Sequence, residues 1–262
     1  PLWIKPAKKV TVKNVADVMR DHYEGTPMDM TTDIGAGGNA LPYRWRPMDF
    51  EYEGKKYTNE RAIATQQTGF WFVGQARGNY PDVIGGILWF GTDDAATSYV
   101  TPIYSNTEKV PECFRQGNGN LLSYSATSSF WINNRISNAC YRMYNIMAPY
   151  VRERIDKFEN EQMEKVRQND VKALELFKKS MDSAEKVGKK KSLAYDVMTD
   201  TGASFAAVKR LLTSYSVKTA QDIFKQWQEL EVTLTVKFID GNVKAQNADG
   251  SFKHTDFSAG IP

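Results

Sequence analysis

The chain contains 262 residues, of which 41% are hydrophobic and 25% are charged, a composition typical of a folded globular protein. Its 34 basic and 31 acidic residues leave a net charge of +3, which is too balanced to favour nucleic acid or an anionic membrane as the partner. Two histidines and two cysteines exclude a histidine-rich metal site and a disulfide framework, and no apolar run reaches the length of a membrane span.

The first half of the chain begins with a helix and a long loop. Thr11 is a typical N-cap, and valines follow it at helical spacing until Gly25, the expected stop. Glycine and proline punctuate residues 26–47, which we therefore expect to be loop. A short hairpin is predicted within residues 49–58, because strand-forming residues flank a Glu-Gly-Lys turn there.

Three further strands are predicted after this hairpin. Residues 68–77 are apolar and aromatic, as a buried strand would be. Residues 86–92 and 98–104 are two strands joined around an acidic turn, and Pro102 places the second of them at an edge or a bulge. Because the strands are few, we consider them one portion of a larger sheet.

The periodicity becomes helical after about residue 127. Ser129 is a candidate cap for the first helix, and Pro149 is expected to kink that helix or to open a new one. Alternating apolar residues predict a last strand over Val232–Ile239. Further helices are expected around residues 171–181, 193–212 and 220–230.

This order of elements predicts an α+β fold, with a strand-rich first half and a helix-rich second half. We divide the chain accordingly into a strand-rich part, residues 1–126, and a helix-rich part, residues 127–262. We expect the two parts to pack together in the same domain.

Two arginines lie between aromatic residues in the proline-bounded segment Tyr43–Pro47. Arg44 and Arg46 can each bind a carboxylate through two parallel hydrogen bonds. The alternative is a surface salt bridge or a cation–π stack, and the sequence does not decide between these interpretations.

Uncharged polar residues and an acidic pair flank the predicted strands. Gln66, Gln67 and Thr68 lie where the chain enters the strand at 68–77. Such side chains serve as oxyanion-hole donors or bind substrate, although buried amides also need partners for structural reasons alone. Asp93 and Asp94 are either a tight-turn pair or a carboxylate that binds an arginine or a substrate ammonium group.

The two cysteines are poor candidates for a nucleophile. Cys113 follows Glu112, whose negative charge disfavours a thiolate, and Cys140 lies on the apolar face of a predicted helix. We therefore expect both thiols to be structural.

Several of these segments resemble the dipeptidase A family of cysteine peptidases. The most specific are TQQTGF at Thr65–Phe70 and GGILWFG within Ile84–Gly91, which the two aspartates follow. The segments Tyr43–Pro47, Tyr99–Tyr104, Ser129–Trp131 and Leu212–Ser216, together with Trp227, fit the same pattern. The resemblance covers about residues 1–244, nearly the whole chain.

Members of that family are N-terminal-nucleophile (Ntn) hydrolases, so the resemblance implies that the strands belong to a four-layer αββα core with added helices. It also implies a cysteine, freed at the mature N-terminus, that attacks the peptide bond of a dipeptide with its own α-amino group as base. No metal and no organic cofactor are implied. Gln66, Gln67 and Thr68 are expected near the substrate pocket.

The family's nucleophile lies upstream of these motifs, and Pro1 has no nucleophilic side chain. We therefore expect this chain to be the C-terminal part of such an enzyme, inactive alone, with the N-terminal part of the same protein as its partner. The alternative is a non-catalytic α+β module that binds a peptide terminus through Arg44 and Arg46. The sequence leaves open a homo-oligomer, and it leaves open whether the parent enzyme acts in the bacterial cytoplasm or is exported.

Overall fold

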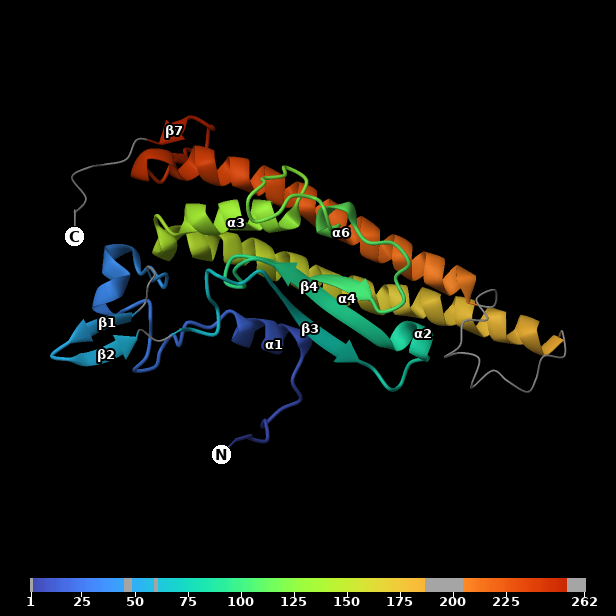
Figure 1. The fold of residues 1–262 in the computed structure, drawn as a ribbon. Coiled ribbons are helices and arrows are strands. Elements are labelled where there is room, and N and C mark those ends of the chain that lie inside the picture. Colours follow the sequence, from blue (N-terminus) through green and yellow to red (C-terminus); the bar gives the residue numbers. More distant parts are fainter. Residues whose placement is uncertain (1, 45–48, 59–60, 187–204, 254–262) are drawn as a thin grey trace.

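The computed structural model describes residues 2–44, 49–58, 61–186 and 205–253 (Figure 1). Two long helices, α4 (Tyr144–Lys186) and α6 (Ala206–Phe238), run side by side, and a three-stranded sheet lies against them. The shorter helix α3 (Ser129–Cys140) packs on both long helices. The described chain is therefore a mixed fold of helices and small antiparallel sheets, which confirms the α+β prediction at this level.

The sheet contains β3 (Phe70–Ala76), β4 (Gly86–Thr92) and β5 (Thr101–Tyr104). β4 lies in the centre, and both of its neighbours run antiparallel to it. All three strands were predicted, and Pro102 lies on an edge strand of the described sheet as expected. β5 begins three residues later than its predicted start, because residues 93–100 form an irregular connection from β4.

Side chains of β3 alternate between a buried and an open face of the sheet. Trp71 and Val73 point into the protein, whereas Phe70 and Phe72 are 63% and 51% exposed. The period of two therefore places one apolar face of the sheet under the helices and leaves another apolar face uncovered in the described part of the chain.

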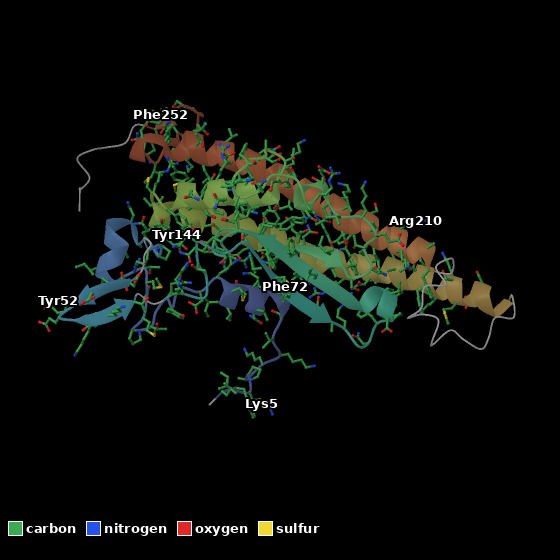
Figure 2. All side chains as sticks on the ribbon, viewed as in Figure 1. Lys5, Tyr52, Phe72, Tyr144, Arg210 and Phe252 are labelled. Carbon is green, nitrogen blue, oxygen red and sulfur yellow. The ribbon has the colours of Figure 1, made fainter. Side chains whose placement is uncertain are left out.

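Both halves of the chain build the core on the buried side, where side chains fill the space between the sheet and the long helices (Figure 2). Tyr99 makes edge-to-face ring contacts with Phe158 of α4 and Trp227 of α6, with ring centroids 5.8 and 4.8 Å apart. Fully buried side chains include Ile84, Trp89, Tyr104, Ile136, Met147, Ile155, Leu212, Ile223 and Leu234.

The first helix, α1 (Val12–Met19), begins where the sequence predicts. The Oγ1 of Thr11 accepts a hydrogen bond from the Asn14 N–H at 3.2 Å, and the Oδ1 of Asn14 accepts one from the Thr11 N–H at 3.1 Å. This reciprocal pair satisfies two N–H groups that a helix start otherwise leaves open. The helix ends before Gly25, because Arg20 is its C-cap and Tyr23 has a φ of 65°.

The predicted hairpin is also present, as β1 (Asp49–Tyr52) and β2 (Lys55–Thr58). Glu53 and Gly54 have φ values of 51° and 70°, and a two-residue hairpin turn of type I′ requires positive φ at both central residues. The remaining short elements are η1 (Ile34–Asn39), α2 (Asp82–Gly85), η2 (Glu112–Phe114), η3 (Ile239–Gly241), β6 (Ala245–Gln246) and β7 (Phe252–Lys253).

The prediction of a last strand over Val232–Ile239 is wrong, because residues 232–238 are the end of α6 and Ile239 begins η3. Its alternation also fits a helix when Leu230 is included. Leu230, Leu234 and Phe238 are four residues apart and buried, whereas Val232 and Val236 are each 61% exposed. Packing of the i, i+4 stripe against the core therefore decides the conformation.

The separate helix expected around residues 171–181 is likewise wrong, because α4 continues without interruption from Tyr144 to Lys186. The helix begins five residues before Pro149 and continues through it, although the proline has no N–H to donate to the Asn145 carbonyl. Residues 206–212 and 220–230 belong to one helix, α6, while 193–204 of the predicted helix lie outside the described residues. No helix within the described ranges is long and apolar enough to cross a membrane.

Candidate functional site

Two of the candidate segments meet at one end of the sheet, where β3 begins and β4 ends. The N–H of Asp93 donates to the carbonyl oxygen of Gly69 at 3.0 Å. Residues 65–68 form a turn just before this point, closed by the Thr68 N–H donating to the Thr65 carbonyl at 3.0 Å. The turn at 65–68 and the Asp93-Asp94 pair therefore lie next to each other, and we call this region the site end of the sheet.

Asp93 is buried and held by neutral donors from α3. Its Oδ1 accepts from Asn134 Nδ2 at 2.9 Å, and its Oδ2 accepts from Ser137 Oγ at 2.6 Å. The residue is 1% exposed and has a φ of 68°, a left-handed conformation that Asp tolerates better than most residues. Burial raises the pKa of Asp93 to about 6, although the hydrogen bonds from Ser137 and Asn134 oppose this rise.

Asp94 is also 1% exposed, and its two oxygens have different partners. Oδ1 accepts from the Ala96 N–H at 3.0 Å, and Oδ2 accepts from the Tyr141 hydroxyl at 2.5 Å. The Tyr141 ring stacks on Tyr43, with centroids 5.3 Å apart. The carboxylate is therefore enclosed by its own turn and by Tyr141, and a ligand at the surface cannot contact it directly in this conformation.

Arg44 holds the loop in which it lies. Its Nη1 donates to the carbonyl oxygens of Leu41 and Tyr43 at 2.7 and 3.2 Å. Its Nη2 donates to the Met30 carbonyl at 3.0 Å and to Asp33 Oδ1 at 2.5 Å. Four of the five guanidinium N–H groups are thus engaged inside the chain, which is the salt-bridge arrangement that the sequence left open.

Close packing around this guanidinium explains a glycine in the same loop. A Cβ added at Gly35 would lie 2.9 Å from Arg44 Nε. Arg46, the second arginine of the pair, lies outside the described residues.

The glutamine turn links this loop to the site end of the sheet. Gln66 Nε2 donates to the Arg44 carbonyl at 3.0 Å, and Thr68 Oγ1 donates to the Thr65 carbonyl at 2.7 Å. Gln66 and Thr68 are half-buried, and Gln67 is exposed. The structure therefore brings Arg44, the glutamine turn and the acidic pair into one region, and the three side chains of the turn are the ones that a ligand can reach most easily.

Sequence reasoning missed a buried ion pair that fixes the connection between β4 and β5. The guanidinium of Arg20 donates to the carbonyl oxygens of Ala95 and Ser98 at 2.9 and 3.0 Å and to Glu159 Oε2 at 3.1 Å. Its Cζ also lies 4.7 Å from the centroid of the Trp71 ring. Arg20 and Glu159 are 139 residues apart in sequence, so no local pattern indicates the pair.

A second missed group lies just after α1. Glu24 Oε2 accepts from the His22 backbone N–H at 2.6 Å, and Glu24 Oε1 lies 3.1 Å from His22 Nδ1. Partial burial alone would raise the pKa of Glu24, but the hydrogen bonds from the His22 side chain and from the backbone lower it to about 2. The His22 ring also contacts Tyr144, at the start of α4, edge to face, with ring centroids 5.9 Å apart.

Both thiols of the chain are enclosed. Cys113 and Cys140 are 3% and 0% exposed, and burial raises the pKa of each to about 12. Each thiol therefore stays protonated at neutral pH and lacks the accessible thiolate that nucleophilic attack requires. Within the described ranges, no group of three or more His, Cys, Asp or Glu side chains is arranged to hold a metal ion.

Comparison with known proteins places these residues in a family. Residues 1–157, which include all the candidate segments, match the model of peptidase family C69. A probable dipeptidase B of Lactococcus lactis subsp. lactis (strain IL1403) is 24% identical over 133 residues, which are 51% of this chain and 24% of that protein. The chain thus spans about a quarter of the length of the curated relative that it matches. The chain belongs to peptidase family C69, as its resemblance to a family of dipeptidases predicts.

Proposed function

We propose that this chain is part of a cysteine-type dipeptidase of the Ntn-hydrolase class whose nucleophile lies outside it. The observation that carries the proposal is the membership of a peptidase family combined with the state of the chain's two cysteines. Both thiols are buried and have raised pKa values, so neither fits the role of an activated nucleophile. The name of the relative, a probable dipeptidase, supports dipeptides as the substrate class.

The proposed reaction needs little from this chain beyond substrate binding. The α-amino group of the N-terminal cysteine, with a pKa of about 8, takes the thiol proton. The thiolate attacks the peptide carbonyl, and the protonated amine passes its proton to the departing amino group, which leaves an acyl-enzyme. Water then hydrolyses the thioester and releases the second amino acid.

The residues of the site end and the adjoining loop are the proposed substrate contacts. Gln66, Gln67 and Thr68 offer amide and hydroxyl donors for the developing oxyanion or for the peptide backbone. Arg44 and Arg46 are the candidates for the substrate carboxylate, and Arg44 would have to exchange some of its present hydrogen bonds for that contact. Asp93 and Asp94 are the candidates for the ammonium group, and their burial means that they would act through the side chains that cover them.

The uncovered face of the sheet supports the view that the rest of the core lies outside this chain. Phe70 and Phe72 are exposed on it, and a neighbouring cavity of about 340 Å³ is lined mainly by apolar side chains of β4 and β5 and of the segment that follows β5, with Lys109 among the few polar ones. No strand among the described residues pairs with the outer edge of β3. An apolar face of this kind usually marks an interface, and a second β-sheet would bury it as in an αββα core.

A second β-sheet on the exposed face is consistent with the proposed division of the chain. The strands of residues 1–126 would belong to the Ntn core, and the helices that the structure describes within residues 127–262 would form the layer packed on it. The N-terminal part of the same protein is then the proposed partner.

The experiment begins with the coding sequence upstream of Pro1. We expect a cysteine directly after a short leader, and we expect the longer product to hydrolyse dipeptides without added metal. Replacing that cysteine by serine should abolish turnover, and mass spectrometry of the wild-type enzyme should detect an acyl adduct on it. If no upstream cysteine exists, or if its replacement leaves turnover intact, the proposal fails and the non-catalytic peptide-binding module becomes the better account.

A further inference from the structure

The acidic pair at the end of β4 is buried without a cation among the described residues. The hydrogen-bond donors to Asp93 and Asp94 are neutral: two side chains of α3, the hydroxyl of Tyr141 and the backbone N–H groups of Asp94 and Ala96. The guanidinium of Arg20 enters the same connection but donates to its carbonyl oxygens and to Glu159. An enclosed carboxylate that lacks a counter-ion is costly to keep ionised.

The network around Ser137 is satisfied in two different ways. Its Oγ lies 2.6 Å from Asp93 Oδ2, 2.7 Å from Thr97 Oγ1 and 3.0 Å from the Asn133 carbonyl oxygen. The hydroxyl carries one proton, so it can serve only one of these acceptors at a time.

When Asp93 is ionised, Ser137 donates to the carboxylate and Thr97 donates to Ser137. When Asp93 is protonated, its own O–H donates to Ser137 Oγ, and Ser137 donates to the Asn133 carbonyl instead. Neither arrangement requires a heavy atom to move, so the site accepts a proton without leaving a polar group unpaired.

We propose that Asp93 is a proton-binding contact between the connection after β4 and helix α3, in which one proton reverses the direction of the hydrogen bond to Ser137 and leaves the contact in place. The backbone N–H of Asp93 bonds to Gly69, which follows the glutamine turn. The hydrogen bonds of Asp93 therefore connect α3 to the segment that carries Gln66, Gln67 and Thr68. This proposal about Asp93 does not depend on the proposed peptidase activity.

The groups around Asp93 favour its titration near pH 6. Burial raises the pKa of Asp93 from 3.8 to about 6, and neighbouring Asp94 acts in the same direction. Other ionisable groups near the pair include Cys140, Tyr141, Tyr144, the Arg20–Glu159 pair and Arg142, which acts on Cys140 from the end of α3. Burial raises the pKa values of the thiol and the two phenols, so they remain neutral across this range.

The direction of the effect on stability follows from linkage. The folded chain binds the Asp93 proton more tightly than the unfolded chain, so this contribution to stability is present at low pH and is lost as the pH rises toward the folded pKa of about 6. Between pH 5 and pH 7.5, ionisation of Asp93 should increase the ratio of unfolded to folded chain about tenfold. Asp93→Asn is permanently neutral and should lack this contribution.

The test uses the purified 262-residue chain. Urea unfolding at several pH values should show that the wild type loses stability relative to Asp93→Asn by about tenfold in the unfolding equilibrium between pH 5 and pH 7.5. Asp182→Asn, which replaces an exposed aspartate of α4, is the matched control and should show no such change against the wild type.

Carbon-detected NMR of the wild-type side-chain carboxyls tests the same site even if Asp93→Asn does not fold. One aspartate should titrate near pH 6, and Ser137→Ala should move that midpoint upward, because it removes a donor to the ionised form. The proposal is overturned if every aspartate titrates below pH 5, or if the aspartate that titrates near pH 6 keeps its midpoint in Ser137→Ala.

Discussion

Arg20 shows how one side chain can hold several elements together. It lies at the end of α1, binds Glu159 of α4, and donates to two carbonyl oxygens of the connection between β4 and β5. Glu159 Oε1 also accepts from the Val100 N–H at 3.0 Å. Both charged side chains are almost fully buried, so each depends on the other for compensation.

We predict that Arg20→Met alone destabilises the chain by about 3–5 kcal/mol, because it leaves the Glu159 carboxylate buried without its partner. The double variant Arg20→Met with Glu159→Met should lose less than Arg20→Met alone. Urea denaturation of the wild type, both single variants and the double variant measures this coupling. Strictly additive losses would show that the pair acts as two independent contacts.

Arg44 and Arg46, the two arginines before the hairpin, are the proposed contacts for the substrate carboxylate. In the proposed longer enzyme, Arg44→Ala and Arg46→Ala should weaken hydrolysis of dipeptides more than that of C-terminally amidated analogues. The expected difference is about 1.5–3 kcal/mol, the value of a hydrogen bond to a charged group. Steady-state kinetics on the two substrate series provides the measurement.

Equal losses for both series would assign a purely structural role to the arginine concerned. For Arg44, that outcome would be accompanied by a lower unfolding free energy, because its guanidinium already bonds to Asp33 and to three carbonyl oxygens.

At the level of elements, the tight contact between β4 and its surroundings rests on Gly91. A Cβ at this position would lie 2.6 Å from the Tyr99 carbonyl oxygen and 2.8 Å from Trp71 Nε1. Gly74, on the neighbouring strand, would meet nothing within 4 Å. The two glycines therefore form a matched pair in one sheet.

We predict that Gly91→Ala destabilises the chain by about 1–3 kcal/mol, because backbone and Trp71 must shift to make room. Gly74→Ala should be neutral or stabilising by up to about 1 kcal/mol, because it restricts the unfolded chain without a clash. Thermal or urea unfolding of both variants distinguishes them. Equal effects at the two positions would contradict the close approach at Gly91.

Much of the strand region is predictable because its signals are local. The aromatic and apolar runs at 70–76 and 86–92 allow few other conformations, and the Glu53-Gly54 turn indicates its hairpin directly. The segment 232–239 is different, since its apolar residues satisfy both a period of two and an i, i+4 spacing. Only contact with the core, which is not a local property, selects the helix.

Part of the candidate site is likewise predictable from local sequence patterns, and part of it is not. The glutamine turn and the acidic pair are recognisable as candidate site residues because they are polar residues that border apolar strands. The structure places them next to each other. The enclosure of Asp93 by Ser137 and Asn134, and the Arg20–Glu159 pair, join residues that are more than 40 apart in sequence. Such contacts follow from the assembled fold and leave no pattern in the sequence.

For the molecule as a whole, the uncovered sheet face should govern how the isolated chain behaves. Phe70→Thr with Phe72→Thr keeps strand-forming residues but removes two exposed rings. We expect the wild-type chain to self-associate with rising concentration and the double variant to do so less, since exposed apolar patches drive association. Sedimentation velocity over a range of concentrations checks this.

Val171→Thr is a suitable control, because Val171 is 56% exposed on α4 rather than on the sheet. Identical association of the wild type and the sheet variant would mean that this face is not an interface.

The central claim is that the chain carries part of a peptidase fold without its nucleophile. The most direct measurement is the release of amino acids from a panel of dipeptides by the purified 262-residue chain, followed by mass spectrometry without added metal. The wild type and the double variant Cys113→Ser with Cys140→Ser should both show no turnover above the blank, because both thiols are buried and protonated. Metal-independent turnover by the wild type that is lost in the double variant, or on replacement of another of the chain's own residues, would contradict the account.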